Sequence, residues 1–310
     1  MKRKISTIPA AILAILLIAA ALSTAAPPPI SQSEMLSEME KTLFGRPVDG
    51  PILPRVSKLE EIVLAKPGAG NLAERVEKLW SELGGDKLSV ASLGYKVVFA
   101  QWIVDGRVGG TSLLDKVAAL EKALFGYVSR EALPVRIARV IEATSGKGGV
   151  DIGYEKLAKG TKLVVTIDTP LSTLKSKPGD TAVITVDEDV IVGSRLAIPA
   201  GTSWESKVVA PTKSNKFDLK NLLEIALEPL PALDGTAVRV YVDDEAISAS
   251  LAQSGLLICQ GENADRLGFF TRGSAVDRLM PGNKNLEIAA GTRIVLSVKE
   301  DQIVNSAKIR

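Results

Sequence analysis

The side chains that most often carry catalysis are missing or unsuitably placed. The chain contains no histidine, which removes the commonest general base and metal ligand and excludes Ser-His-Asp and Cys-His arrangements. Its single cysteine, Cys259, lies in the apolar run LLICQG, where a buried inert thiol is expected rather than a nucleophile. The glycines at 146–149 follow a predicted helix, whereas a phosphate-binding loop joins a strand to the helix after it.

Two acidic clusters remain as candidates for acid–base chemistry or calcium binding, Asp187-Glu188-Asp189 and Asp243-Asp244-Glu245. In an extended chain Asp187 and Asp189 point to one side and Glu188 to the other, so they do not face each other across a substrate as glycosidase carboxylates do. Neither cluster has the Asp-x-Asp-x-Asp-Gly loop that favours calcium. We therefore predict no catalytic residue, no metal and no cofactor, and a protein that is not an enzyme.

A repeated amphipathic helix organises the N-terminal half. In the stretch TSLLDKVAALEKALFG, Val117, Leu120 and Leu124 fall on one face at spacings of three and four. Charged residues take the other side, and Gly126 supplies the left-handed residue that commonly ends a helix. Helices this short, roughly 10–12 residues, are marginal alone in water, so we expect them to pack on one another or on a partner.

The pattern recurs six times over residues 34–146, with steps of 20, 20, 21, 20 and 20 residues. The copy around Val97 has the weakest charge pattern. The predicted core pairs of the other five copies are Leu36 and Met39, Val56 and Leu59, Val76 and Leu79, Val117 and Leu120, and Ile137 and Val140. The predicted helix stops are Gly45, Gly85, Gly106, Gly126 and Gly146.

The aromatic residues of this half allow two interpretations. They are Phe44, Trp80, Phe99, Trp102 and Phe125. They could stack on carbohydrate, but Phe44 and Phe125 occupy equivalent repeat positions just before a glycine. Core packing is therefore the favoured interpretation.

The periodicity changes to two in the C-terminal half. Glycines mark a linker at 147–159, and residues 160–310 contain several runs rich in β-branched residues between Pro-Gly turn signals. Strands without long helices between them favour a barrel or sandwich. The predicted fold class is therefore α+β and multidomain, with an N-terminal short-helix repeat region followed by an all-β barrel or sandwich. The role of residues 251–290 is left open.

The first residues have the layout of a secretory signal peptide. Lys2, Arg3 and Lys4 precede the apolar run 8–22, and small residues follow. We predict cleavage after Ala25 and a proline-rich leader over 26–33; an uncleaved membrane anchor is the alternative. Without the three basic residues the chain has 35 basic and 36 acidic residues, and nothing in it resembles the clustered basic surface of a nucleic-acid-binding protein.

Two resemblances to bacterial proteins follow from these motifs. The phrases EKTLFG and EKALFG, with the pattern arginine-hydrophobic-x-x-leucine-glutamate, resemble a repeat of secreted and envelope proteins. In the C-terminal half, Gly160-Thr161, Leu171-Ser172-Thr173, Pro178-Gly179-Asp180 and Ile198-Pro199-Ala200-Gly201-Thr202 occur in an order that resembles the C-terminal β-barrel of channel-forming proteins of conjugation-type (type IV) secretion systems. Those proteins also carry a helical antenna, which has no counterpart in this sequence.

Together these features predict an exported bacterial protein of the periplasm or cell surface. Its helical repeats would bind a protein or cell-wall partner, its β-domain would be structural, and it could form a homo-oligomer. It would contact the membrane only through an uncleaved signal segment. Two alternatives are a component of a trans-envelope secretion or pilus assembly, and a cell-wall hydrolase that uses acidic residues.

Overall fold

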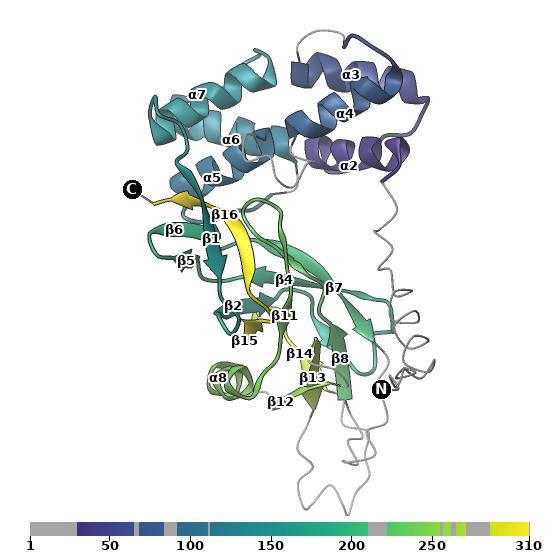
Figure 1. The fold of residues 1–310 in the computed structure, drawn as a ribbon. Coiled ribbons are helices and arrows are strands. Elements are labelled where there is room, and N and C mark those ends of the chain that lie inside the picture. Colours follow the sequence, from purple (N-terminus) through teal and green to yellow (C-terminus); the bar gives the residue numbers. More distant parts are fainter. Residues whose placement is uncertain are drawn as a thin grey trace, which may run out of the picture.

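The computed structural model describes residues 30–64, 68–83, 92–110, 112–209, 222–254, 257–261, 265–270 and 286–309. The predicted signal peptide and Gly85 lie outside these residues. Within them, six helices precede a mostly β region that ends in a curled sheet, so the architecture is α+β (Figure 1). No helix in the described ranges is both long and apolar enough to cross a membrane.

The helices form a layer at one end of the molecule, which we call the helical array (Figure 1). They are α2 (Gln32–Phe44), α3 (Ile52–Leu64), α4 (Leu72–Leu83), α5 (Leu93–Asp105), α6 (Leu113–Phe125) and α7 (Leu133–Ser145). Ser31 caps α2 in a capping box with Glu34, so this helix begins within the expected proline-rich leader. The ten predicted core residues lie in one apolar cluster, and each is at most 2% exposed.

The four predicted glycine stops that lie within the described residues fall at helix ends. Gly45, Gly106 and Gly126 are left-handed C-caps whose backbone N–H groups bond the carbonyls of Lys41, Trp102 and Lys122. Gly146 follows α7 with a positive φ but an extended ψ.

Buried ion pairs join successive helices at a constant spacing. Glu40, Glu60 and Glu121, each at most 1% exposed, accept hydrogen bonds from both Nε and Nη2 of the arginine fifteen residues later. The N–O distances in the three pairs run from 2.7 to 3.1 Å. The partners are Arg55, Arg75 and Arg136. We call this set the ion-pair ladder.

The same glutamates also hold the connecting loops. The backbone N–H of Val48 donates to Glu40 at 2.9 Å and that of Ser129 to Glu121 at 3.2 Å, eight residues on in each case. Gly68 plays this role for Glu60. Each glutamate thus ties its own helix to the next loop and to the next helix, which leaves little freedom in the spacing between helices.

The strands build two main sheets over one core. Their bounds are β1 (Ile152–Leu157), β2 (Lys162–Ile167), β3 (Leu171–Ser172), β4 (Thr181–Val186), β5 (Val190–Val192), β6 (Arg195–Ile198), β7 (Ser203–Val209), β8 (Leu222–Ala226), β9 (Leu230–Pro231), β10 (Ala237–Val238), β11 (Val240–Tyr241), β12 (Leu257–Gln260), β13 (Arg266–Phe270), β14 (Glu287–Ile288), β15 (Thr292–Val298) and β16 (Gln302–Lys308). The larger sheet has the order β11-β15-β2-β4-β7-β8-β13-β12, and the smaller one β1-β16-β6-β5.

Two bent strand pairs, of which only the second is a hairpin, connect these sheets. In the larger sheet β2 pairs with β15 and β4 with β7, while their continuations β1–β16 and β5–β6 pair in the smaller sheet. Apolar residues from both sheets, such as Ile184, Val304 and Ile198, pack in a single cluster. We call this part, residues 152–309, the β-domain.

Three Gly-Thr pairs start strands by the same turn. Gly160, Gly201 and Gly291 have φ between 83° and 87°, where a side chain is strained. The threonine after each glycine donates its hydroxyl to the carbonyl three residues earlier, at 2.7 to 2.8 Å. β2, β7 and β15 begin at or just after these turns. The turn signals in the sequence therefore mark real strand starts.

Several sequence predictions were wrong in detail. The expected linker over 147–159 contains β1, which pairs with β16. The run DVIVGSRLAIP at 189–199 reads in the sequence as one strand, but it turns back at Gly193 to form the β5–β6 hairpin. The run RIVL at 293–296 reads as a final strand, but β16 follows it.

A helix that the sequence analysis did not predict follows β11. α8 (Asp244–Ser254) packs beside β15, where Ser250 Oγ accepts a hydrogen bond from the backbone N–H of Val295 at 2.7 Å. Asp243 caps it by accepting from the backbone N–H of Ala246 at 2.6 Å. The signal for this helix was present in the sequence, since a capping Asp followed by two acidic residues is typical of a helix start.

Substitution of one ladder glutamate tests the stability of the array. Arg75 holds the pKa of Glu60 below 4.5, so the carboxylate is charged in the folded protein at neutral pH. Glu60→Gln leaves Arg75 without its anion and should lower the free energy of unfolding by about 3 kcal/mol, measured with urea at pH 7.

The control is Glu61→Gln, which changes the exposed neighbour of Glu60 and should cost less than about 0.5 kcal/mol. Because the pKa of Glu60 is lower in the folded protein than in the unfolded chain, its charged carboxylate stabilises the fold above pH 4.5. This contribution is lost as the pH falls through the pKa of Glu60 in the folded protein. The difference in free energy of unfolding between the wild type and Glu60→Gln should therefore become smaller below pH 4.5. Equal losses in the two variants would show that the ladder does not stabilise the array.

Candidate functional site

The fourth helix of the array departs from the repeat because it has two buried faces. On one face Val97 and Ala100 pack in the array and are fully buried. On the other, Tyr95 and Phe99 pack against the β-domain and are at most 5% exposed. The weak charge pattern of this copy therefore has a structural cause, since a polar outer face could not pack on the sheet. We call the contact region between α5 and the β-domain the seam.

The β-domain offers an apolar surface to this helix. Leu196 in β6 lies directly opposite Ala307 in β16, and both are fully buried against α5 together with Leu233. Ala197, next to Leu196 in β6, and Val304, three residues before Ala307 in β16, face the β-domain core instead. Burial raises the pKa of the Tyr95 phenol, and the nearby carboxylate of Asp234 raises it further.

Trp102 adds a polar bond to the seam. Its indole N–H donates to both carboxylate oxygens of Asp189 at 3.0 Å, and its ring stacks on Phe99 with centroids 5.9 Å apart. Asp189 also accepts the backbone N–H of Ala200 at 2.6 Å. This acidic residue therefore orients an aromatic ring and a turn of the β-domain at once.

The loop after α5 closes the seam by a backbone contact. The N–H of Val108 donates to the carbonyl of Ala200 at 2.8 Å. Gly201 lies so close that a Cβ at this position would overlap the carbonyl oxygen of Val108. Glycine is thus required here both by its positive φ and by the close approach of the array.

A cavity of about 490 Å³ opens at the seam. Phe99, Trp102 and Ile103 from α5 form its apolar wall together with Ile309. Thr144 and Ser145 at the end of α7 also line it, and Asp151 and Lys308 supply charges of opposite sign. Largely apolar cavities with a few polar groups, set between two structural units, are the usual form of ligand sites.

The aromatic residues of the array thus divide into two sets. Phe44, Trp80 and Phe125 pack on the array core, as the sequence favoured. Phe99 and Trp102 instead face the β-domain and line the cavity.

The acidic clusters are occupied by structural contacts. Residues 187–189 form a bend rather than an extended segment, so Asp187 and Glu188 both pair with Arg293 while Asp189 turns to Trp102. The expected alternation of these three side chains was therefore wrong. In the other cluster, Asp243 binds Lys162 at 3.1 Å as well as capping α8. Glu245 binds the same lysine at 3.2 Å.

No metal site is evident in the described ranges, where no group of three or more cysteine, aspartate or glutamate side chains could hold an ion. Cys259 lies in β12, and burial raises the pKa of its thiol to about 11, with Glu224 adding to the effect. The thiol is therefore protonated near neutral pH.

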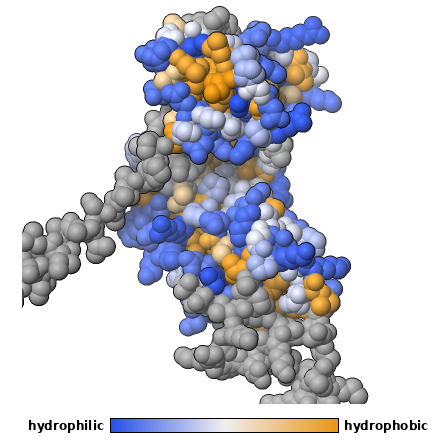
Figure 2. All heavy atoms as spheres, turned by 90° about the vertical axis from the view of Figure 1, so that its right-hand side faces the viewer, coloured by the Kyte–Doolittle hydropathy of each residue, from blue (hydrophilic) through white to orange (hydrophobic). Residues whose placement is uncertain are grey.

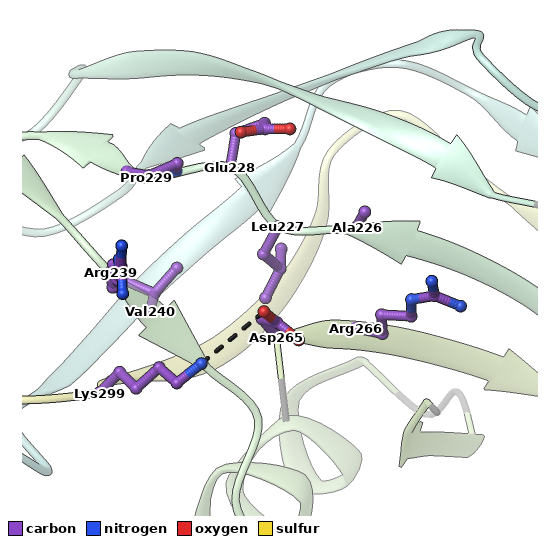
Figure 3. Close-up of a pocket in the computed structure, with 9 residues that line it drawn as sticks. All are labelled: Ala226, Leu227, Glu228, Pro229, Arg239, Val240, Asp265, Arg266 and Lys299. Carbon is purple, nitrogen blue, oxygen red and sulfur yellow. Dashed lines mark ion pairs between the residues drawn. The ribbon is translucent and has the colours of Figure 1, made fainter. Parts of the chain in front are cut away.

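A second cavity, of about 470 Å³, lies at the end of the larger sheet (Figure 3). It is lined by Arg239, Arg266 and Lys299 together with the acidic residues Asp265 and Glu228. Figure 3 shows Lys299 reaching toward Asp265, with a nitrogen–oxygen distance of 3.7 Å. Arg239 and Arg266 pair with Glu300 and Glu224. Since each cation already has an anion, this cavity has little net charge to offer a ligand.

The array also exposes apolar side chains away from the seam. Figure 2 shows an apolar area on the helical end of the molecule, framed by polar side chains. Among the exposed apolar residues of the array are Ile52 and Leu53 at the start of α3, with 39% and 55% exposure. A substitution on this surface can therefore serve as a control for binding at the seam.

Sequence reasoning missed the seam and the ladder. The glutamate–arginine spacing of fifteen residues is visible in three copies and could have indicated the ladder. The only sign of the seam in the sequence was the lack of charged residues around Val97. This lack does not indicate which part of the protein packs on the helix. Asp151 and Lys308 stand 157 residues apart in the chain, and no local pattern connects them.

Comparison with known proteins does not identify a family. No protein-family model and no curated protein matches the chain. Among solved structures, the chain is similar to ComB10 of the Com type IV secretion system of Helicobacter pylori, at 13% identity and a TM-score of 0.27, over 47% of this chain and 88% of that one. A TM-score this low does not establish a shared fold or role. The resemblance seen in the turn series therefore stays a prediction.

A glycine substitution tests the close approach at the seam. Gly201→Ala should lower the free energy of unfolding by about 3 kcal/mol or more, because it combines a strained φ with backbone overlap at Val108. The control is Gly291→Ala, which has a similar φ of 87° but open space around the added methyl group. It should cost about 1–2 kcal/mol. Urea unfolding would measure both, and equal losses would show that the backbone contact is absent in solution.

Proposed function

We propose that this chain is an exported, non-enzymatic binding protein of the bacterial cell envelope. Its seam cavity receives a group displayed by the cell wall or by a protein partner. The N-terminal charge and hydropathy pattern supports export. The cavity between the array and the β-domain is the single observation that supports binding most directly.

The two halves have different parts in this proposal. The array supplies the aromatic wall through α5 and a further part of the lining through the end of α7. The β-domain fixes that wall, because Asp189 orients Trp102 and the backbone of Ala200 holds the loop after α5. A ligand would thus meet a surface already shaped by the contact between the halves, which limits the ordering cost of binding.

Co-sedimentation with purified cell-wall sacculi tests this function. The chain from Ala26 onward should bind. Ile103→Glu places a charge in the apolar wall and should weaken binding about tenfold or more. Ile103 is 38% exposed, so the variant should remain folded, as circular dichroism would check.

The matched control is Leu53→Glu, on the exposed apolar surface of α3. It should bind like the wild type. If Leu53→Glu lost binding and Ile103→Glu did not, the array surface rather than the seam would be the binding site. If the wild type did not bind at all, the wall would be excluded as its partner.

A further inference from the structure

The rim of the seam cavity presents a cation and an anion side by side. Asp151 and Lys308 face each other at the end of the β1–β16 pair, where the N–H of Lys308 donates to the carbonyl of Asp151 at 2.8 Å. Their side chains are 56% and 54% exposed, and the Nζ–Oδ2 distance is 3.9 Å. The backbone is therefore fixed while the charged ends are only loosely paired.

A second cation, Arg195, positions Asp151 but binds only one of its two carboxylate oxygens. Arg195 binds the other carboxylate oxygen, Oδ1, at 2.9 Å and the main-chain carbonyl at 3.1 Å. It can lie across β1 because Gly153 has no side chain to displace it. The bond to Arg195 also lowers the pKa of Asp151, so its carboxylate is charged near neutral pH. Oδ2 remains open to a ligand that displaces Lys308.

The wall of the cavity beside this rim is apolar. Trp102 is held in place by Asp189, and Ile103 and Ile309 extend the apolar surface. A ligand that fits both parts must carry an apolar chain and must satisfy both charges. A ligand with a single charge would pair with only one of these two side chains, whereas a ligand that carries both charges can pair with both.

We propose that the seam cavity binds an unblocked α-amino acid group on an aliphatic chain. The ligand's ammonium meets Asp151, its carboxylate meets Lys308, and its chain lies on the apolar wall formed by Trp102 and Ile103. This assignment rests on the proposed binding function and names its ligand. Such a group occurs in free amino acids and at the free end of a diamino acid within a wall peptide, so two sources share this chemistry.

Titration calorimetry with matched small molecules tests the assignment on the chain from Ala26 onward. The probes are leucine, N-acetyl-leucine, leucinamide and meso-diaminopimelate. The two blocked leucines each lack one charge of the head group and should bind about tenfold more weakly than leucine. Tighter binding of diaminopimelate would identify the wall as the source, and tighter binding of leucine would identify free amino acids.

Variants at the rim give the second measurement. Lys308→Met should weaken leucine binding about tenfold, and Lys308→Arg should restore most of it. Lys299→Met is the control, because Lys299 carries the same charge but lines the other cavity. It should bind leucine like the wild type.

Three results would overturn the assignment. If the blocked leucines bound as tightly as leucine, the charged residues of the rim would not be binding the ammonium and carboxylate of the ligand. A Lys308→Met variant with unchanged affinity would remove the cation from the site. The absence of heat with every probe up to about 10 mM would exclude the ligand class. Binding of sacculi that still depends on Ile103 would, in any of these cases, leave the proposed function standing.

Discussion

The apolar contact between α5 and the smaller sheet sets the arrangement of the two halves. α5 buries Val97 in the array and Phe99 on the β-domain, so it belongs to both cores. A helix with only one apolar face could not do this, because its outer charges would lose water without gaining partners. The indole–carboxylate bond from Trp102 to Asp189 and the approach of Val108 to Gly201 then fix the orientation.

The ion-pair ladder fixes the length of three of the five steps of the repeat. A glutamate that must reach an arginine fifteen residues later allows no insertion between two helices. The only step of 21 residues runs from Val76 to Val97, and there Trp80 and Lys96 occupy the ladder positions in place of a pair. The ladder is thus interrupted on both sides of α5, because Gln101 and Lys116 occupy its positions in the next step. Freed from that spacing, α5 carries the aromatic face that meets the β-domain.

Much of the fold could be predicted from the sequence because its signals are local. A spacing of three and four apolar residues indicated the helices, and Gly-Thr pairs indicated the starts of β2, β7 and β15. β1 and β16 were missed, since their pairing joins residues about 150 positions apart and their exposed residues hide the alternation. The cavity could not be predicted for the same reason. Its walls come from α5, α7, the start of β1 and the end of β16, which only tertiary packing brings together.

This arrangement accounts for the position of the candidate site. Asp189, which a search for catalytic acids would single out, instead orients the aromatic wall of the cavity. Asp151 and Lys308 reach the rim because β1 begins and β16 ends beneath the array (Figure 1). The site therefore exists only while the array and the β-domain remain docked, and its shape depends on their common stability.

Differential scanning calorimetry of the chain from Ala26 onward tests this dependence most directly. If the seam couples the halves, the protein should unfold in one transition whose calorimetric and van't Hoff enthalpies agree. Two separated transitions, with the β-domain unfolding as it would without the array, would contradict the account. The seam would then be a contact between independent domains rather than the feature that builds the site.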